Sequence, residues 1–281
     1  MTFGCRAAVM LAALCAGCAA PPQPATPPAQ ERIAEAATRG AALARAGDNA
    51  AAALRFQEAL RIARTIEDAD AVGANAISLS IVYQRLGHYA AARSALAVLL
   101  DAPPGRFPER RLLQAELHQA ILALAASDTR DATAQAQRAW ERCQRLGCGL
   151  AAAILNVQSN AAFDGGDAEA SLRLAQAAEA SARGRADRAE TANALRNIGR
   201  ARARLGDPAS AIAVLEQALE IDRALADPRK ILADLAELER ASAASGDAQA
   251  ARGYSERALA ISRAARDGTG TNETEGQLRL R

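Results

Sequence analysis

A two-residue corner returns along the chain at an almost constant interval. In "RLGDPASAIAVLEQALEI" (204–221), Gly206 and Asp207 separate two alanine-rich amphipathic segments. Glycine takes the left-handed backbone that ends one helix, an Asp carboxylate accepts the free N–H groups of the next, and Pro208 suits a first helical position. Equivalent corners, in steps of 40, 40, 39, 40 and 40 residues, are Gly47-Asp48, Gly87-His88, Ser127-Asp128, Gly166-Asp167, Gly206-Asp207 and Gly246-Asp247. Six helical hairpins at a fixed period predict a solenoid.

Small residues recur at fixed offsets from these corners. Five residues after each corner's first residue stand Ala52, Ala92, Ala132, Ser171, Ala211 and Ala251. Twelve residues after it stand Ala59, Leu99, Ala139, Ala178, Ala218 and Ala258. Alanine favours helices, and only 3% of the residues are aromatic, so stability must come from many close helix contacts. We therefore expect an all-α fold. A coiled coil would need an unbroken heptad pattern, which the corners interrupt, and a four-helix bundle would not repeat six times.

The repeated positions resemble the tetratricopeptide repeat family in its 40-residue form, over about residues 31–266. The resemblance is carried by three groups of residues: Gly40, Leu43, Gly47, Ala52, Phe56, Ala59 and Leu60; Leu79, Tyr83, Gly87, Tyr89, Ala92 and Leu96; and Gly199, Gly206, Ala211, Leu215, Ala218 and Leu219. It implies a right-handed superhelix of antiparallel helix pairs, with a concave groove lined by the first helix of each pair. The third repeat departs from the pattern, because Ser127 replaces the turn glycine.

The N-terminus carries a targeting signal. The apolar stretch "AAVMLAAL" (7–14) is too short to cross a bilayer as a permanent helix. The following "LCAGC" (14–18) resembles the bacterial lipobox. This resemblance implies a signal peptide over 1–17, lipid on Cys18 and, because Ala19 is not Asp, an outer-membrane lipoprotein facing the periplasm. An ordinary secretory signal, which would leave a soluble periplasmic protein, is the alternative.

Two segments outside the repeats are predicted to lack a packed core. Residues 18–30 contain five prolines within "AAPPQPATPPAQ" (19–30), a composition that favours polyproline II. Such a stretch makes a stiff tether of about 35 Å between the anchor and the repeats. The tail over 267–281 has turn formers and no periodic face, and is expected to be disordered. No later segment is apolar enough to span a membrane.

Two cysteines remain in the repeat region, in "CQRLGC". Cys143 and Cys148 lie five residues apart, too far for a disulfide along a continuous helix. Gly147 could turn the chain back and let them pair in an oxidising compartment. Two separate thiols at a helix end are the alternative. The spacing does not fit a metal site.

Catalysis, cofactors and nucleic acid find no support. The net charge of +2 lacks the basic excess of a nucleic-acid binder. His88 occupies a turn, and His118 lies two residues from Glu116, whereas helical metal ligands stand three or four apart. No nucleophile motif or phosphate-binding glycine loop is present. We therefore expect neither an enzyme nor a bound cofactor or metal.

A polar stripe in the fifth repeat is the best candidate site. In "TANALRNIGRARARLG", Arg196, Arg200 and Arg204 are four apart and share one face, separate from the packing side. In the 40-residue subclass that this chain resembles, an asparagine at the position of Asn197 often contacts the backbone of a bound peptide. Amides suit main-chain recognition and guanidinium groups suit carboxylates. The candidate peptide-binding residues are Asn156, Asn160, Asn193, Arg196, Asn197, Arg200, Arg204 and Arg240. A solvated charged face is the alternative.

The leading hypothesis is a lipid-anchored periplasmic adaptor that binds an extended, acidic or C-terminal segment of a protein partner in its groove. Relatives with this layout include pilus or secretin assembly factors and cell-wall enzyme regulators, which suggests a role in envelope, pilus or secretion-complex assembly. The alternative is a structural solenoid that associates with itself and has no peptide groove.

Overall fold

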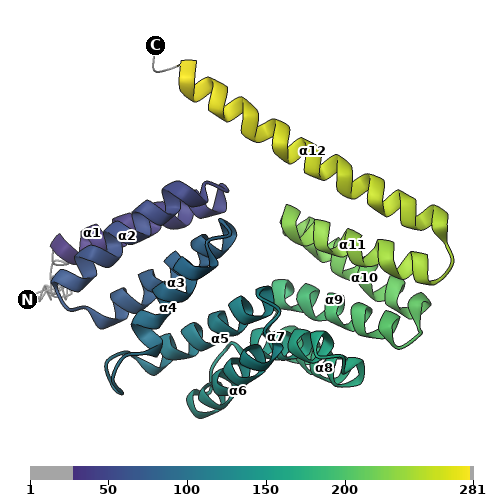
Figure 1. The fold of residues 1–281 in the computed structure, drawn as a ribbon, viewed down its shortest axis with the longest axis horizontal. Coiled ribbons are helices and arrows are strands. Elements are labelled where there is room, and N and C mark those ends of the chain that lie inside the picture. The colour runs from purple at the N-terminus through teal and green to yellow at the C-terminus, as the bar shows by residue number, and fades with distance from the viewer. Residues whose placement is uncertain (1–27, 279–281) are drawn as a thin grey trace, which may run out of the picture.

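The computed structural model describes the backbone of residues 28–278 and the side chains of residues 28–264. Within that range the chain forms twelve α-helices and no strand. In chain order they are α1 (Pro28–Arg45), α2 (Asn49–Thr65), α3 (Ala69–Arg85), α4 (Tyr89–Leu100), α5 (Glu109–Ala125), α6 (Thr129–Leu146), α7 (Ala151–Asp164), α8 (Ala168–Gly184), α9 (Arg188–Arg204), α10 (Pro208–Ala224), α11 (Pro228–Ala244) and α12 (Ala248–Leu278). Consecutive helices pair as hairpins, which follow one another along an arc (Figure 1). The predicted all-α solenoid of six helical hairpins is confirmed.

The predicted corners join the two helices of each hairpin. Gly206 has a φ of 87°, and the Asp207 carboxylate accepts the Ser210 N–H at 3.1 Å. Ser127 takes a φ of 59° at the third corner, so the turn keeps its left-handed geometry without a glycine. The conformation that the solenoid requires therefore overrides the intrinsic preference of the residue there.

A second set of corners, between the hairpins, was not predicted. Three of them place a non-glycine residue in the left-handed region, followed by an aspartate that caps the next helix. Glu67, Ala186 and Ala226 have φ values of 54°, 55° and 54°. The carboxylates of Asp68, Asp187 and Asp227 accept N–H groups in the first turns of α3, α9 and α11. Because these corners lack glycine, the aspartate about halfway between two glycine corners is the one feature of the sequence that marks them.

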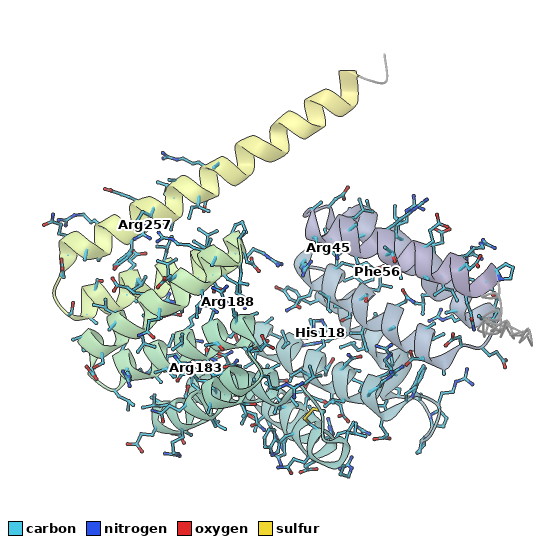
Figure 2. All side chains as sticks on the ribbon, turned by 180° about the vertical axis from the view of Figure 1, so that it is seen from behind. Arg45, Phe56, His118, Arg183, Arg188 and Arg257 are labelled. Atoms are coloured by element: carbon cyan, nitrogen blue, oxygen red, sulfur yellow. A yellow bond between two sulfur atoms is a disulfide. The ribbon has the colours of Figure 1, made fainter. Side chains whose placement is uncertain are left out.

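The constant spacing of small residues along the chain corresponds to buried helix crossings. Ala211 is fully buried, and an added Cβ at Gly199 would lie 2.4 Å from the Leu215 Cγ. Helices α9 and α10 can therefore approach this closely only because position 199 has no side chain. The first hairpin uses the same device, since the ring of Phe56 (labelled in Figure 2) lies against Gly40. Ala258 is only half-buried, and among the described residues no hairpin packs against the outer side of α12.

The ends of the solenoid differ from the predicted boundaries. Helix α1 begins at Pro28, so the last residues of the predicted tether (18–30) are already helical. Helix α12 continues to Leu278 and runs past the end of α11 in Figure 1, although the sequence predicts disorder over 267–281. Extending an existing helix by one residue costs far less free energy than starting a new helix. Helix α12 can therefore continue through residues that, read alone, favour turns. The predicted signal peptide and Cys18 lie outside the described residues. Among the helices described here, none is both long enough and apolar enough to cross a membrane.

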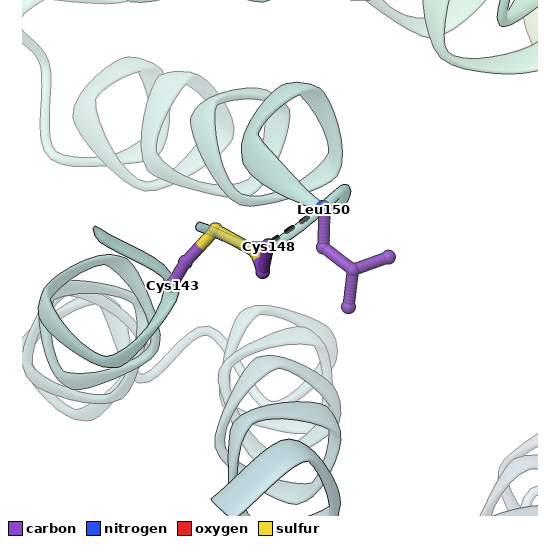
Figure 3. Close-up of a disulfide and its surroundings, with 3 residues drawn as sticks. All are labelled: Cys143, Cys148 and Leu150. Carbon is purple, nitrogen blue, oxygen red and sulfur yellow. Dashed lines mark hydrogen bonds between the residues drawn. A yellow bond between two sulfur atoms is a disulfide. The ribbon is translucent and has the colours of Figure 1, made fainter. Parts of the chain in front are cut away.

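A disulfide fixes the junction between the third and fourth hairpins. Cys143 in the last turn of α6 is bonded to Cys148, with their Cα atoms 4.9 Å apart. Gly147 takes the left-handed conformation, with φ 59° and ψ 42°, and turns the chain back as the bridge requires. The Leu150 N–H donates to the Cys148 Sγ at 3.2 Å (Figure 3). No side chain caps the start of α7, whereas Asp68, Asp187 and Asp227 cap α3, α9 and α11 at three of the other junctions.

Candidate peptide-binding groove

Most of the predicted binding residues line one hollow on the inner side of the solenoid. Its walls come from α5, α7, α9 and α11, which are all first helices of hairpins, and its volume is about 380 Å³. This is the placement that the family resemblance implies for a ligand groove. The predicted residues that line it are Asn156, Asn160, Asn193, Arg196, Asn197 and Arg200. Leu117, Ile121 and Val157 provide apolar surface beside them.

The remaining predicted residues line an adjoining hollow. Arg204 and Arg240 face a space of about 460 Å³ between α9 and α11. Arg200 and Glu237 line both hollows, so the two are continuous. The sequence pattern thus brought together residues of three different repeats that share one surface. We refer to the two hollows together as the groove.

Arg196 holds the solenoid together beneath this groove, contrary to the expectation of an exposed arginine stripe. Arg196 is only 8% exposed to solvent. Its Nε donates to the Asp234 Oδ1 at 2.7 Å, and its Nη2 ion-pairs with Asp222. Because these partners lie on α11 and α10, Arg196 joins three helices. The spacing of residues along α9 correctly predicts the face on which Arg196 lies. It could not show that α10 and α11 supply carboxylates to that face.

Asp234, one of the two acidic partners of Arg196, has a raised pKa. Asp234 is fully buried, and its Oδ2 has no hydrogen-bond partner among the described residues. Burial raises the pKa of Asp234 to about 7, and the nearby Asp222 carboxylate adds to this, although the Arg196 charge opposes both. The Arg196 charge therefore offsets only part of the effect of burial on the Asp234 carboxyl group.

The asparagines of the groove form a ladder between neighbouring repeats. The Asn197 Nδ2 donates to the Asn156 backbone carbonyl at 3.2 Å. The Asn156 Nδ2 in turn donates to the Glu190 carbonyl at 3.1 Å and to its Oε2 at 2.8 Å. Both asparagines are buried, so their amide groups first serve to join α7 to α9.

Three further arginines line the groove, and carboxylates of the chain neutralise their charges to different extents. Arg200 donates to the Asn160 Oδ1 at 2.8 Å, pairs with Glu237 at 3.2 Å, and stacks 4.2 Å from the Phe163 ring centroid. Arg240 pairs with Glu237 at 2.6 Å. Arg204 lies 5.8 Å from the same ring and ion-pairs with none of the described carboxylates. Much of the positive charge predicted for the groove is thus neutralised within the chain.

Lys230 also lines the groove, although no sequence pattern indicates it. It is the one lysine of the sequence and stands in the first turn of α11. Its Nζ donates to the Asn193 Oδ1 at 2.7 Å, and no ion pair among the described residues includes it. Burial lowers the pKa of Lys230, and the charge of Arg196 lowers it further. Two of its three N–H donors therefore remain for another acceptor, a feature that only the positions of α9 and α11 reveal.

Comparison with known proteins agrees with this architecture. Residues 150–224, which span α7 to α10, match the family described as Tetratricopeptide repeat. No curated protein sequence matches the chain significantly.

Solved structures share the solenoid. BtubC (BKLC) from P. vanneervenii is 22% identical, with a TM-score of 0.55 over 86% of this chain and 94% of that one. A Rap protein complexed with Competence and Sporulation Factor is 17% identical, with a TM-score of 0.57 over 83% and 66% of the two chains. A STAND protein with a tetratricopeptide repeat sensor from Pyrococcus horikoshii is 15% identical, with a TM-score of 0.59 over 77% and 33%. At these identities the likeness concerns the fold. Residues 150–224 are thus similar to the tetratricopeptide repeat family, and the described part of the chain shares its helical solenoid fold with these solved structures.

Proposed function

We propose that this chain is a protein-interaction scaffold whose groove binds an extended, carboxylate-bearing segment of a protein partner. The observation that carries the proposal is Lys230, a half-buried cation in the groove wall whose ammonium group donates to Asn193 and to no other of the described side chains. A partially desolvated ammonium with free donors gains most from an incoming carboxylate, because water screens that interaction poorly there.

The rest of the groove suits a peptide more than a small polar ligand. Leu117, Ile121 and Leu124 line one side, and polar residues of α9 line the other. Such a surface holds apolar side chains of an extended segment while polar groups meet its backbone. The solenoid fold shared with a Rap protein that was solved in complex with Competence and Sporulation Factor is consistent with this use of the fold. The arginines contribute less than the sequence suggested, since Arg196 is committed to buried aspartates.

The proposal includes the location inferred from the N-terminal sequence. Lipid on Cys18 and a proline-rich stretch would hold the repeats near the periplasmic face of the outer membrane, where a scaffold could serve envelope, pilus or secretion-complex assembly. Labelling of growing cells with a radioactive fatty acid tests the anchor. The proposed lipoprotein incorporates the label and its Cys18→Ala variant does not, whereas equal labelling of both would contradict the anchor.

The test of the groove uses the full chain in its native host, with crosslinking and quantitative mass spectrometry. Lys230→Gln should reduce recovery of the principal partner by about tenfold, the effect of losing one charge-assisted contact. Arg229→Gln is the matched control, because Arg229 is the neighbouring exposed cation and does not line the groove. Equal loss in both variants, or in neither, would refute the groove. Self-crosslinks as the main product would favour the self-associating solenoid instead.

A further inference from the structure

We propose that the second helices of the first two repeats form another docking surface, which binds an acidic amphipathic segment of a partner protein. This surface lies on α2 and α4, on the side chains of α3 between them and on the loop that follows α4, whereas the groove lies on the first helices of later repeats. It is independent of the proposed groove function.

The surface has a hollow with an apolar floor. Between α2 and α4 lies a space of about 750 Å³. Leu60, Leu79 and Ala95 form its buried floor, and Val98 is half-buried at its edge. The Tyr83 hydroxyl in its wall already accepts a hydrogen bond from the Gln57 amide at 2.6 Å. Apolar side chains that enter the hollow would therefore meet the apolar residues of its floor.

A second hollow extends this one toward the loop between α4 and α5. Its volume is about 530 Å³, and Val72, Phe107 and Pro103 are among its lining residues. Arg64 and Val98 line both hollows. One bound segment can thus cross from the first hollow to the second without leaving the surface.

The rim of the surface carries positive charge that the chain does not neutralise. Arg61, Arg64 and Arg106 are exposed and line the two hollows. None of the three takes part in an ion pair among the described residues. Glu67 is the acidic residue of the lining, so cations outnumber anions there. This differs from the groove, where carboxylates of the chain hold Arg196, Arg200 and Arg240.

Charge and shape together select the occupant. Guanidinium groups form paired hydrogen bonds with carboxylates, and apolar hollows need side chains to fill them. A segment with acidic residues flanking apolar ones satisfies both requirements. An anionic bilayer would meet the arginines, but its flat surface would leave the hollows unfilled.

The experiment selects random short peptides, displayed on phage, against the immobilised full chain. We expect one enriched class with carboxylates flanking apolar residues. A synthetic member of that class should bind at least about tenfold more weakly to the variant Arg61→Glu/Arg64→Glu/Arg106→Glu. Loss of a single charge-assisted contact, about 1.5 kcal/mol, already corresponds to a tenfold change. The variant Arg188→Glu/Arg223→Glu/Arg252→Glu, which changes the net charge equally at exposed arginines elsewhere, should bind normally.

Several results would overturn the proposal. The first is the absence of an acidic apolar class, and the second is equal binding of that class to both triple variants. Loss of binding in Lys230→Gln with retention in the α2–α4 variant would assign the class to the groove. Binding of the full chain to phosphatidylglycerol vesicles through these arginines, with no peptide class, would assign the surface to a membrane. Circular dichroism of each variant verifies that the helices are intact.

Discussion

Replacement of Gly199 by alanine should destabilise the fifth hairpin, although the same replacement normally stabilises a helix. An alanine Cβ at this position would lie 2.4 Å from the Leu215 Cγ and 2.7 Å from its Cδ2. Leu215 is 1% exposed and packed in the core between α9 and α11, so it has little room to move. Overpacking of a core costs about 1–3 kcal/mol, while alanine in place of a helical glycine gains about 1 kcal/mol. With contacts this short, we expect a net loss of about 1–2 kcal/mol.

Gly253→Ala is the matched control for this prediction. Gly253 also lies within a helix, but nothing comes within 4 Å of the position of its Cβ, so we expect a gain of about 1 kcal/mol. Repeat arrays do not always unfold in one step, so native-state hydrogen exchange of α9 and α10 is measured together with urea unfolding. In a double-mutant cycle, Gly199→Ala should cost less when Leu215 is already alanine. Stabilisation by Gly199→Ala equal to that of Gly253→Ala would refute the close packing of α9 against α10.

Three further predictions concern buried chemistry. Replacement of both Cys143 and Cys148 by serine should lower the free energy of unfolding by about 2 kcal/mol, the loop-closure value for so short a loop, and added reductant should then have no further effect in urea unfolding. Burial lowers the pKa of His118 from 6.5 to about 4, so between these values the unfolded chain binds a proton that the folded chain does not. The free energy of unfolding should therefore fall by up to about 3 kcal/mol as the pH falls from 6.5 toward 4, as measured by urea unfolding. His118→Gln should abolish this loss, and an unchanged pH profile in the variant would contradict the role of His118. Arg196→Met should cost about 3–5 kcal/mol at neutral pH, because it removes the cation that pairs with Asp222 and Asp234 in the core. A loss under about 1 kcal/mol in urea unfolding would mean that the pairing is weak.

The fold was largely predictable because its corners depend on local chemistry. A glycine followed by an aspartate specifies a helix end and a helix start, as at Gly206 and Asp207, without knowledge of the rest of the chain. The corners at Glu67, Ala186 and Ala226 were missed, because their left-handed backbone is imposed by the packing of neighbouring hairpins. Local preference gives no warning of such positions.

The site was predictable in position but not in detail. Helical spacing shows which residues of one helix share a face, and it placed Arg196, Arg200 and Arg204 along the groove. It does not show what neighbouring helices contribute, and Asp234 reaches Arg196 from a helix that begins more than twenty residues later in sequence. Lys230 was overlooked for the same reason, since its hydrogen bond to Asn193 exists only when α11 lies beside α9.

Site-specific photocrosslinking in the native host tests most directly whether the groove receives a partner. A photoreactive amino acid replaces Ala233, which lines the groove on α11, or Ala209, which is exposed on α10 and lines neither hollow of the groove. We predict a discrete adduct between the full chain and a partner protein from position 233 that weakens in the Lys230→Gln background, and no such adduct from position 209. Adducts of equal yield from both positions, or adducts from position 209 alone, would contradict a partner-binding groove on the first helices.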